Sequence, residues 1–98
     1  MKIDVPGQSS MIKYYEPDTQ AMLQMEECTR LVEAIGAMRR ASLYGIDNGQ
    51  AYNALVEGMA DALICLEQLQ ELYDVSNFEL QDLINRKCRR MRDQISKR

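Results

Sequence analysis

The chain has no histidine among its 98 residues, and this absence excludes several kinds of active site. Catalytic Ser-His-Asp and Cys-His arrangements, the usual catalytic zinc sites and histidine-based pH switches all need an imidazole. Hydrolytic chemistry in this protein would therefore depend on carboxylates, a metal ion and bound water.

Other absences narrow the class of protein further. The three cysteines, Cys28, Cys65 and Cys88, are odd in number and lack the C-x-x-C spacing, which favours free thiols in a reducing cytoplasm over a disulfide framework. No segment resembles a signal peptide, and the longest aliphatic run, residues 62–66, is far too short to cross a bilayer. The sequence therefore predicts a cytoplasmic protein without a membrane span.

Charge is unevenly distributed along the chain. Residues 86–98 contain seven Lys or Arg against one acid, whereas residues 1–85 contain five against fourteen acids. An acidic body can hold a metal ion and a basic tail can bind a polyanion, although a solvated helix end explains the tail equally well. The tail is short and has no interleaved aromatic residues, so nucleic acid is not predicted as a partner.

Apolar periodicity predicts an all-α fold, with three main helices at about residues 19–42, 50–73 and 77–96. Residues 1–16 lack periodicity and are predicted to form an irregular N-terminal arm, so that residues 17–98 make up a single helical domain. Asp18 is the expected N-cap of the first helix, and Ser76 with Glu79 fits a capping box that opens the third.

Apolar stripes are expected to pack these helices together. The stripe predicted for the first helix consists of Ala21, Met25, Cys28, Val32 and Ile35. The stripe predicted for the third helix consists of Leu80, Ile84, Cys88, Met91 and Ile95. Because three helices of about twenty residues enclose only a thin core, we expect oligomerisation to complete the bundle, in a homodimer or a homotetramer.

Two pairs of acids interrupt the apolar pattern. Glu26 and Glu27 lie in the first helix, while Glu57 and Asp61 lie four residues apart in the second. A carboxylate in an apolar helix is costly unless a cation or hydrogen bonds compensate it. Two such helices facing each other would form a carboxylate cage of the kind that binds Mg²⁺ beside a phosphate chain.

The sequence also resembles a known family over about residues 14–95. The segments DTQAMLQMEECTRL, LVEGMADALICLEQL and INRKCRRMRDQI are similar to the MazG-like all-α nucleoside triphosphate pyrophosphohydrolases. That family has an E-E-x-x-E motif on one helix, E-x-x-D within E-E-x-A-D on the next, and frequently an N-x-K-x-x-R element downstream. The order of these segments, the spacing of their residues and their apolar context all agree with the motifs of that family.

This resemblance implies a hydrolase that cleaves a nucleoside triphosphate between its α and β phosphates, with Mg²⁺, or alternatively Mn²⁺, as cofactor. It implies that Glu27 and Asp61 are the catalytic acids. The residues expected to bind the metal are Glu26, Glu27, Glu57 and Asp61. The residues expected to bind phosphate are Arg30, Asn85, Lys87 and Arg90.

Two departures from the family motif bear on activity. Arg30 occupies the position of the last acid of the first motif, and Gly58 occupies the position of an acid in the second. Weak or absent turnover is therefore one expectation. The alternatives are a catalytically inactive nucleotide-binding module, in which Arg30 contacts phosphate directly, and a helical adaptor or regulatory protein that binds no nucleotide.

Overall fold

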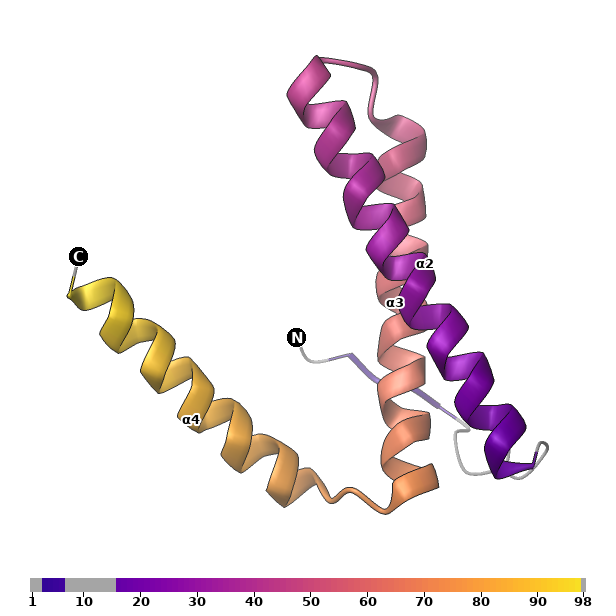
Figure 1. Cartoon of the computed structure of the whole chain (residues 1–98), viewed down its shortest axis with the longest axis vertical. Helices are drawn as coiled ribbons and strands as arrows, with labels where there is room; N and C mark the ends of the chain where they lie inside the picture. The colour runs from indigo at the N-terminus through magenta and orange to yellow at the C-terminus, as the bar shows by residue number, and fades with distance from the viewer. Residues whose placement is uncertain (1–2, 7–15, 98) are drawn as a thin grey trace.

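The computed structural model describes residues 3–6 and 16–97. The described residues form three α-helices and no strand: α2 (Pro17–Tyr44), α3 (Gly49–Tyr73) and α4 (Asn77–Ser96). This arrangement confirms the predicted all-α fold with three helices (Figure 1). Most of the irregular arm predicted at residues 1–16 lies outside the described residues. Within the described part of the chain, no helix is long and apolar enough to cross a membrane.

The start of α2 differs from the prediction by two residues. The helix begins at Pro17 after Glu16, whose backbone is extended, and no side chain caps it. Proline is well suited to this first position because its missing N–H would have no intrahelical partner there. The prediction that Asp18 is the N-cap is therefore wrong, since Asp18 lies within the first turn. At the other end, Gly45 adopts a left-handed conformation with φ 64° and closes the helix on the carbonyl of Ala41.

The start of α4 agrees with the prediction. The hydroxyl oxygen of Ser76 accepts a hydrogen bond of 3.0 Å from the backbone N–H of Glu79, as expected of a capping box. α3 ends at Tyr73, and its C-cap, Asp74, has a positive φ of 54°. The turn between the two helices therefore consists of residues 74–76 alone.

α2 and α3 pack together as an antiparallel hairpin that contains all the fully buried residues of the described chain (Figure 1). The buried residues are Gln20, Gln24, Ala34 and Ala41 of α2 and Gly58 and Cys65 of α3. Small residues allow a close crossing, since a Cβ on Gly58 would lie only 3.5 Å from the Cα of Leu31. The two helices therefore approach each other closely at Gly58 and Leu31.

The stripe predicted for the first helix is displaced from the one that packs. The predicted stripe begins at Ala21, whereas the observed one begins at Gln20, and one residue corresponds to about 100° of rotation. Met25 and Val32 consequently remain 70% and 68% exposed. The apolar spacing thus predicted the helix correctly but not the face that packs, because α3 lies on the adjacent face, where the buried residues are small or polar.

α4 extends away from the hairpin (Figure 1). None of its twenty residues, all of which the structure describes, is buried, so the predicted burial of its apolar stripe is also wrong for the single chain. The radius of gyration is 16.6 Å, compared with about 13 Å for a compact domain of this length. The single chain therefore leaves much of its apolar surface uncovered.

Candidate functional site

A hollow of about 310 Å³ between α2 and α3 contains two of the four acids that the sequence singled out, Glu57 and Asp61. Its polar lining comes from both helices. The lining residues are Arg30, Glu33, Ala34, Ala37, Ala54, Glu57, Gly58 and Asp61. One guanidinium faces three carboxylates, which gives the hollow a formal charge of −2. Such a negatively charged surface attracts cations. Arg30 is the one positively charged side chain among its lining residues.

Glu27 and Asp61 lie at the same level of the hairpin. On one side of this level, the Cys65 thiol lies 3.8 Å from the carbonyl oxygen of Gln24, and on the other, Gly58 faces Leu31. Gln24 and Leu31 of α2 thus lie opposite Cys65 and Gly58 of α3, as expected of antiparallel helices. The residue midway between Gln24 and Leu31 is Glu27. The midpoint between Gly58 and Cys65 falls at residues 61–62. Both acids are partly buried. The two acids that the resemblance identified as catalytic therefore lie at one level of the hairpin, but only Asp61 lines the hollow.

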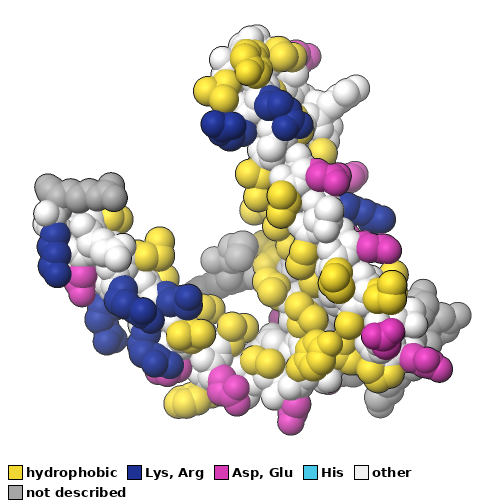
Figure 2. Space-filling model, viewed as in Figure 1, with side chains coloured by type: hydrophobic (Ala, Val, Ile, Leu, Met, Phe, Trp, Pro, Cys, Tyr) yellow, Lys and Arg dark blue, Asp and Glu magenta, His cyan; other side chains and the backbone are white. Residues whose placement is uncertain are grey.

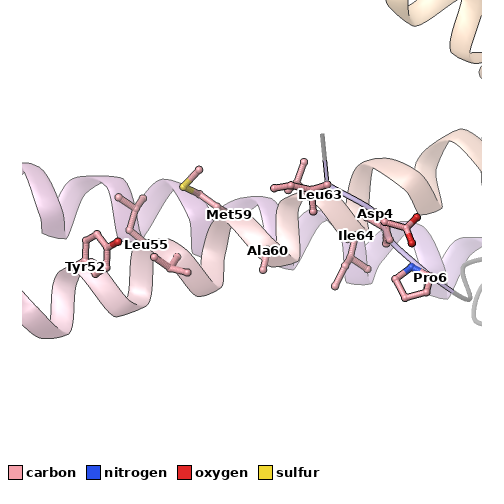
Figure 3. Close-up of a pocket in the computed structure, with 11 residues that line it drawn as sticks. Asp4, Pro6, Tyr52, Leu55, Met59, Ala60, Leu63 and Ile64 are labelled. Carbon is pink, nitrogen blue, oxygen red and sulfur yellow. The ribbon is translucent and has the colours of Figure 1, made fainter. Parts of the chain in front are cut away.

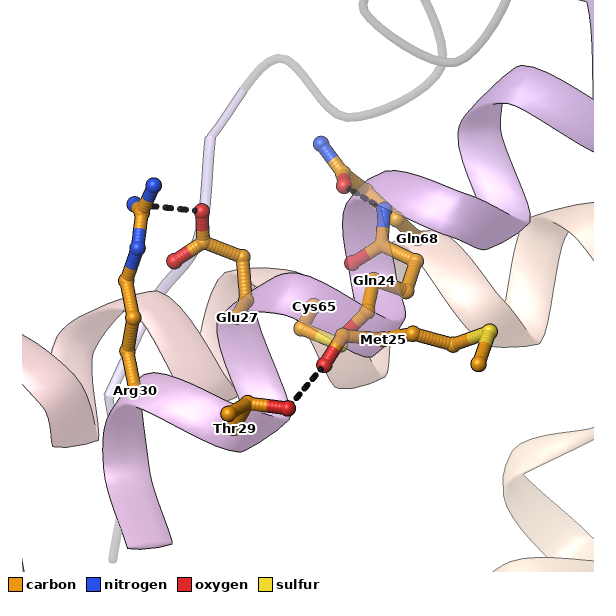
Figure 4. A network of polar contacts seen from close by, with 7 residues as sticks. All are labelled: Gln24, Met25, Glu27, Thr29, Arg30, Cys65 and Gln68. Atoms are coloured by element: carbon orange, nitrogen blue, oxygen red, sulfur yellow. Dashed lines mark hydrogen bonds and ion pairs between the residues drawn. The ribbon is translucent and has the colours of Figure 1, made fainter. Parts of the chain in front are cut away.

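Glu27 forms an ion pair with Arg30 along one face of α2 (Figure 4). Nη1 of Arg30 lies 3.0 Å from Oε1 of Glu27, and the Arg30 side chain remains 63% exposed. Pairs of this kind on a helix stabilise a protein by only about 0.3–0.5 kcal/mol. An incoming phosphate or cation can therefore displace the pair at little cost.

The second carboxylate oxygen of Glu27, Oε2, is buried, and no described residue donates a hydrogen bond to it. A buried polar atom without a partner loses its hydration and gains nothing in return. A cation or a water proton at this position would restore the missing interaction. This atom is the structural feature that points most directly to a ligand.

One thiol and two amide side chains lie next to Glu27, towards the N-terminal end of α2: those of Cys65, Gln24 and Gln68 (Figure 4). Cys65 is 1% exposed, and its burial, together with the nearby Cys28 and Glu27, raises the pKa of its thiol to about 11. One turn further, the Gln68 side-chain oxygen accepts hydrogen bonds from the amides of Gln20 and Gln24. Cys65 is thus a neutral packing residue, and the glutamines fix the register of the two helices.

The predicted phosphate-binding residues of α4 lie outside the hollow. Asn85, Lys87 and Arg90 are all exposed, and the Asn85 side chain accepts a hydrogen bond from Gln81 on its own helix. α4 does not pack extensively against α2 or α3 within the single chain. The hollow itself is lined by only one of the four predicted phosphate-binding residues, Arg30.

The four acids predicted to bind a metal are only partly brought together. Glu57 and Asp61 line the hollow, Glu27 is partly buried but does not line it, and Glu26 is exposed. Among the described residues, no three His, Cys, Asp or Glu side chains converge closely enough to enclose a metal ion. Glu33 joins the hollow although no motif marks it, and its spacing of three residues from Arg30 was the only sequence signal.

Comparisons with protein-family models, with curated proteins and with solved structures gave no match to this chain. The MazG-like resemblance therefore depends on the motif residues alone. The hairpin, its hollow and the acids within it are the basis on which a function can be proposed.

Proposed function

We propose that this protein is a Mg²⁺-dependent nucleoside triphosphate pyrophosphohydrolase with a reduced metal site, releasing a nucleoside monophosphate and pyrophosphate. The observation that supports this proposal most strongly is the placement of Glu27 and Asp61 at one level of the α2–α3 hairpin, beside a hollow lined by Arg30. Paired carboxylates next to a single cationic group suit a phosphate chain that arrives with its metal ion.

The residues present fit a magnesium ion of limited protein coordination. All the donors are carboxylate oxygens, which hard cations prefer, and Oε2 of Glu27 is buried without a partner. Mg²⁺ in nucleotide sites is commonly held by one or two carboxylates, several waters and the substrate phosphates, so three converging acids are not required. When bound, the ion would neutralise phosphate charge and lower the pKa of the attacking water. Glu27, Glu57 and Asp61 are the residues that would hold it.

The protein's own residues supply the rest of the chemistry in this proposal. Arg30 binds a phosphate oxygen with its exposed guanidinium, which frees Oε1 of Glu27 from the ion pair. A carboxylate oxygen of Glu27 or Asp61 accepts the proton of the water that attacks the α-phosphorus. The bond between that phosphorus and the bridging oxygen breaks, and pyrophosphate leaves.

A panel of canonical and modified nucleoside triphosphates, assayed for monophosphate and pyrophosphate with Mg²⁺ and with Mn²⁺, tests this proposal. We expect turnover with at least one substrate, loss of turnover in EDTA, and loss in Asp61→Asn. Asp18→Asn is the matched control, because Asp18 is an exposed acid in the first turn of α2 and does not line the hollow. Equal rates in Asp61→Asn and the control, or no turnover with any substrate, would refute the assignment.

The two departures from the motif offer a gain-of-function test. A Cβ at position 58 would make ordinary contacts, at 3.4 Å with Cδ1 of Leu31 and 3.7 Å with Cβ of Ala34. A side chain can therefore begin at this position without displacing the backbone. We expect Arg30→Glu combined with Gly58→Glu to raise the Mg²⁺-dependent rate above that of the unmodified chain.

A second candidate, metal-independent nucleotide binding, is favoured by the Arg30–Glu27 ion pair itself. With Glu27 neutralised by Arg30, the guanidinium occupies the place of the metal charge and remains exposed to a phosphate. Calorimetric titration of Arg30→Ala separates the two functions. Nucleotide binding in EDTA that disappears in this variant supports the binding module, whereas Mg²⁺-dependent binding that persists supports the hydrolase. If no nucleotide binds either with Mg²⁺ or in EDTA, the result supports the helical adaptor or regulatory protein.

The proposal includes self-association into a homodimer or a homotetramer. The exposed apolar residues of α2, α3 and α4 are too many for a small monomer to leave in water. Sedimentation analysis of the whole chain tests this part independently of catalysis.

A further inference from the structure

Cys28 of α2 and Cys65 of α3 carry free thiols that the proposed hydrolase does not use. Cys28 is exposed, whereas Cys65 is only 1% exposed. Cys65 does not line the apolar groove of about 650 Å³ on the opposite side of α3 from the acidic hollow, where Met59 and Leu63 lie (Figure 3). Its sulfur faces α2 instead, 3.8 Å from the carbonyl oxygen of Gln24.

This carbonyl oxygen places the sulfur of Cys65 beside the backbone of Cys28. In an α-helix, the oxygen of Gln24 accepts the backbone N–H of the residue four positions later, which is Cys28. With about 3 Å for that hydrogen bond, the Cys65 sulfur lies at most about 7 Å from the backbone nitrogen of Cys28. Each side chain leans towards the N-terminus of its own helix. Because the helices are antiparallel, the two thiols lean towards each other.

Cys28 also lines a hollow of about 450 Å³ that reaches across both helices. Leu69 of α3, one turn from Cys65, lines the same hollow, and the other lining residues are Ala21, Gln24, Met25, Thr29 and Tyr73. Burial, and next the neighbouring Cys28 thiol, raise the pKa of Cys65 to about 11, which agrees with two sulfurs in close proximity. A small reagent can therefore reach Cys28 from solvent, while Cys65 is accessible mainly to Cys28.

The backbones of this hairpin approach each other as closely as a disulfide requires. Two cysteines can be joined when their Cα atoms lie within about 7 Å. Gly58 is two turns from Cys65, and a Cβ on it would lie 3.5 Å from the Cα of Leu31. The Cα atoms of Gly58 and Leu31 are therefore within about 5 Å of each other.

Cys88, the third cysteine, lies apart from this pair in the single chain. It is an exposed residue of α4, which does not pack extensively against α2 or α3. Figure 2 shows α4 as the arm along which basic side chains gather, separate from the hairpin. Cys88 therefore reports how an exposed thiol of this chain reacts without a neighbouring thiol.

We propose that Cys28 and Cys65 form an oxidation-sensitive dithiol pair, which a hydroperoxide converts into a disulfide that cross-links α2 to α3. The sulfur of Cys28 attacks one oxygen of hydrogen peroxide, the O–O bond breaks, and water leaves with the thiol proton, so that Cys28 becomes a sulfenic acid. The sulfur of Cys65 then attacks the sulfur of Cys28, the S–O bond breaks, and a second water takes the proton of Cys65. Two thiols are oxidised and one peroxide is reduced to water.

The cross-link would make the stability of the hairpin depend on oxidation. It closes a loop that contains the whole turn between α2 and α3, and such a loop restricts the unfolded chain more than the folded one. We therefore expect the oxidised chain to unfold at a higher urea concentration than the reduced chain. Dithiothreitol reverses the reaction by thiol–disulfide exchange and should remove this difference.

Treatment of the whole folded chain with hydrogen peroxide tests the pair, with Cys88→Ser as background so that no second exposed thiol competes. The remaining thiols are blocked with N-ethylmaleimide, and mass spectrometry of unreduced peptides locates the bonds. We expect a disulfide between Cys28 and Cys65 of one chain. In the same background, Cys65→Ala should stop at the sulfenic acid of Cys28, which dimedone traps, and Cys28→Ser should leave Cys65 as a thiol.

Three results would overturn the proposal: both thiols persisting in the treated chain, a disulfide that links two chains, or oxidation of Cys65 at an undiminished rate in Cys28→Ser. A cross-link that forms as fast in concentrated urea as in buffer would also overturn it, because the fold would then not bring the thiols together. Circular dichroism shows whether Cys65→Ala remains helical. Cys28→Ser changes an exposed position and keeps the test decisive if Cys65→Ala does not fold. The assay contains no nucleotide, so its failure and that of the proposed hydrolase are distinguishable.

Discussion

Replacing Gly58 by alanine is expected to stabilise the protein, although the glycine is buried against α2. A Cβ there would lie 3.4 Å from Cδ1 of Leu31, 3.5 Å from its Cα and 3.7 Å from Cβ of Ala34. These separations are ordinary van der Waals contacts, so the added methyl group fits without moving either helix. The residue is helical and buried, and its φ is not positive.

Two terms set the magnitude of this effect. Alanine is favoured over glycine inside a helix by about 0.8–1.0 kcal/mol. Burying one further methyl group contributes up to about 0.8 kcal/mol, because the contacts at 3.4–3.7 Å are ordinary ones. We therefore expect Gly58→Ala to raise the free energy of unfolding by about 1–2 kcal/mol, with a rise in Tm of roughly 4–8 °C for each kcal/mol.

Urea denaturation at one fixed protein concentration measures this change, with Gly36→Ala as the matched control. A Cβ at Gly36 would meet only Nη1 of Arg40, the flexible end of a side chain, at 3.3 Å. Gly36→Ala should therefore report the helix propensity without the contact to the facing helix. If Gly58→Ala destabilised the protein while Gly36→Ala stabilised it, the helices would lie closer together than the distances of 3.4–3.7 Å around position 58 indicate, and an acid there would not fit either.

Three further predictions concern single residues. Gly45→Ala places a Cβ at φ 64° and should cost about 1 kcal/mol of unfolding free energy, measured by urea denaturation; no loss would contradict the left-handed cap. Ser76→Ala removes the hydrogen bond to the N–H of Glu79 and should cost about 1 kcal/mol, whereas Ser76→Asp should retain most of the stability. Burial raises the pKa of the Cys65 thiol from 9.0 to about 11, so the folded state holds this proton more tightly than the unfolded state. The resulting stability is complete below pH 9 and should fall by roughly 2 kcal/mol as the pH rises to 11, a loss that Cys65→Ala should not show in denaturation experiments across this range.

Part of the candidate site could be predicted from the sequence. Glu57 and Asp61 interrupt an apolar helix at a spacing that places both on one face, and the structure finds both in one hollow. Glu26 and Glu27 are adjacent, so periodicity could not decide which of them faces α3. The burial of Oε2 of Glu27, and the exposure of Glu26, depend on the rotation of α2 against α3.

The sequence by itself determined the local structure of this protein. The Ser76–Glu79 cap, the left-handed Gly45 and the apolar periodicity determined three helices with boundaries within two residues of those observed, because these signals act over one or two turns of backbone. Only the tertiary structure decided which faces pack. α3 lies against the stripe of Gln20 and Gln24 rather than that of Met25 and Val32, since small residues at the crossing let the backbones approach. An apolar stripe shows that a helix needs a partner, but the partner is chosen by the shape and charge of the surface that meets it.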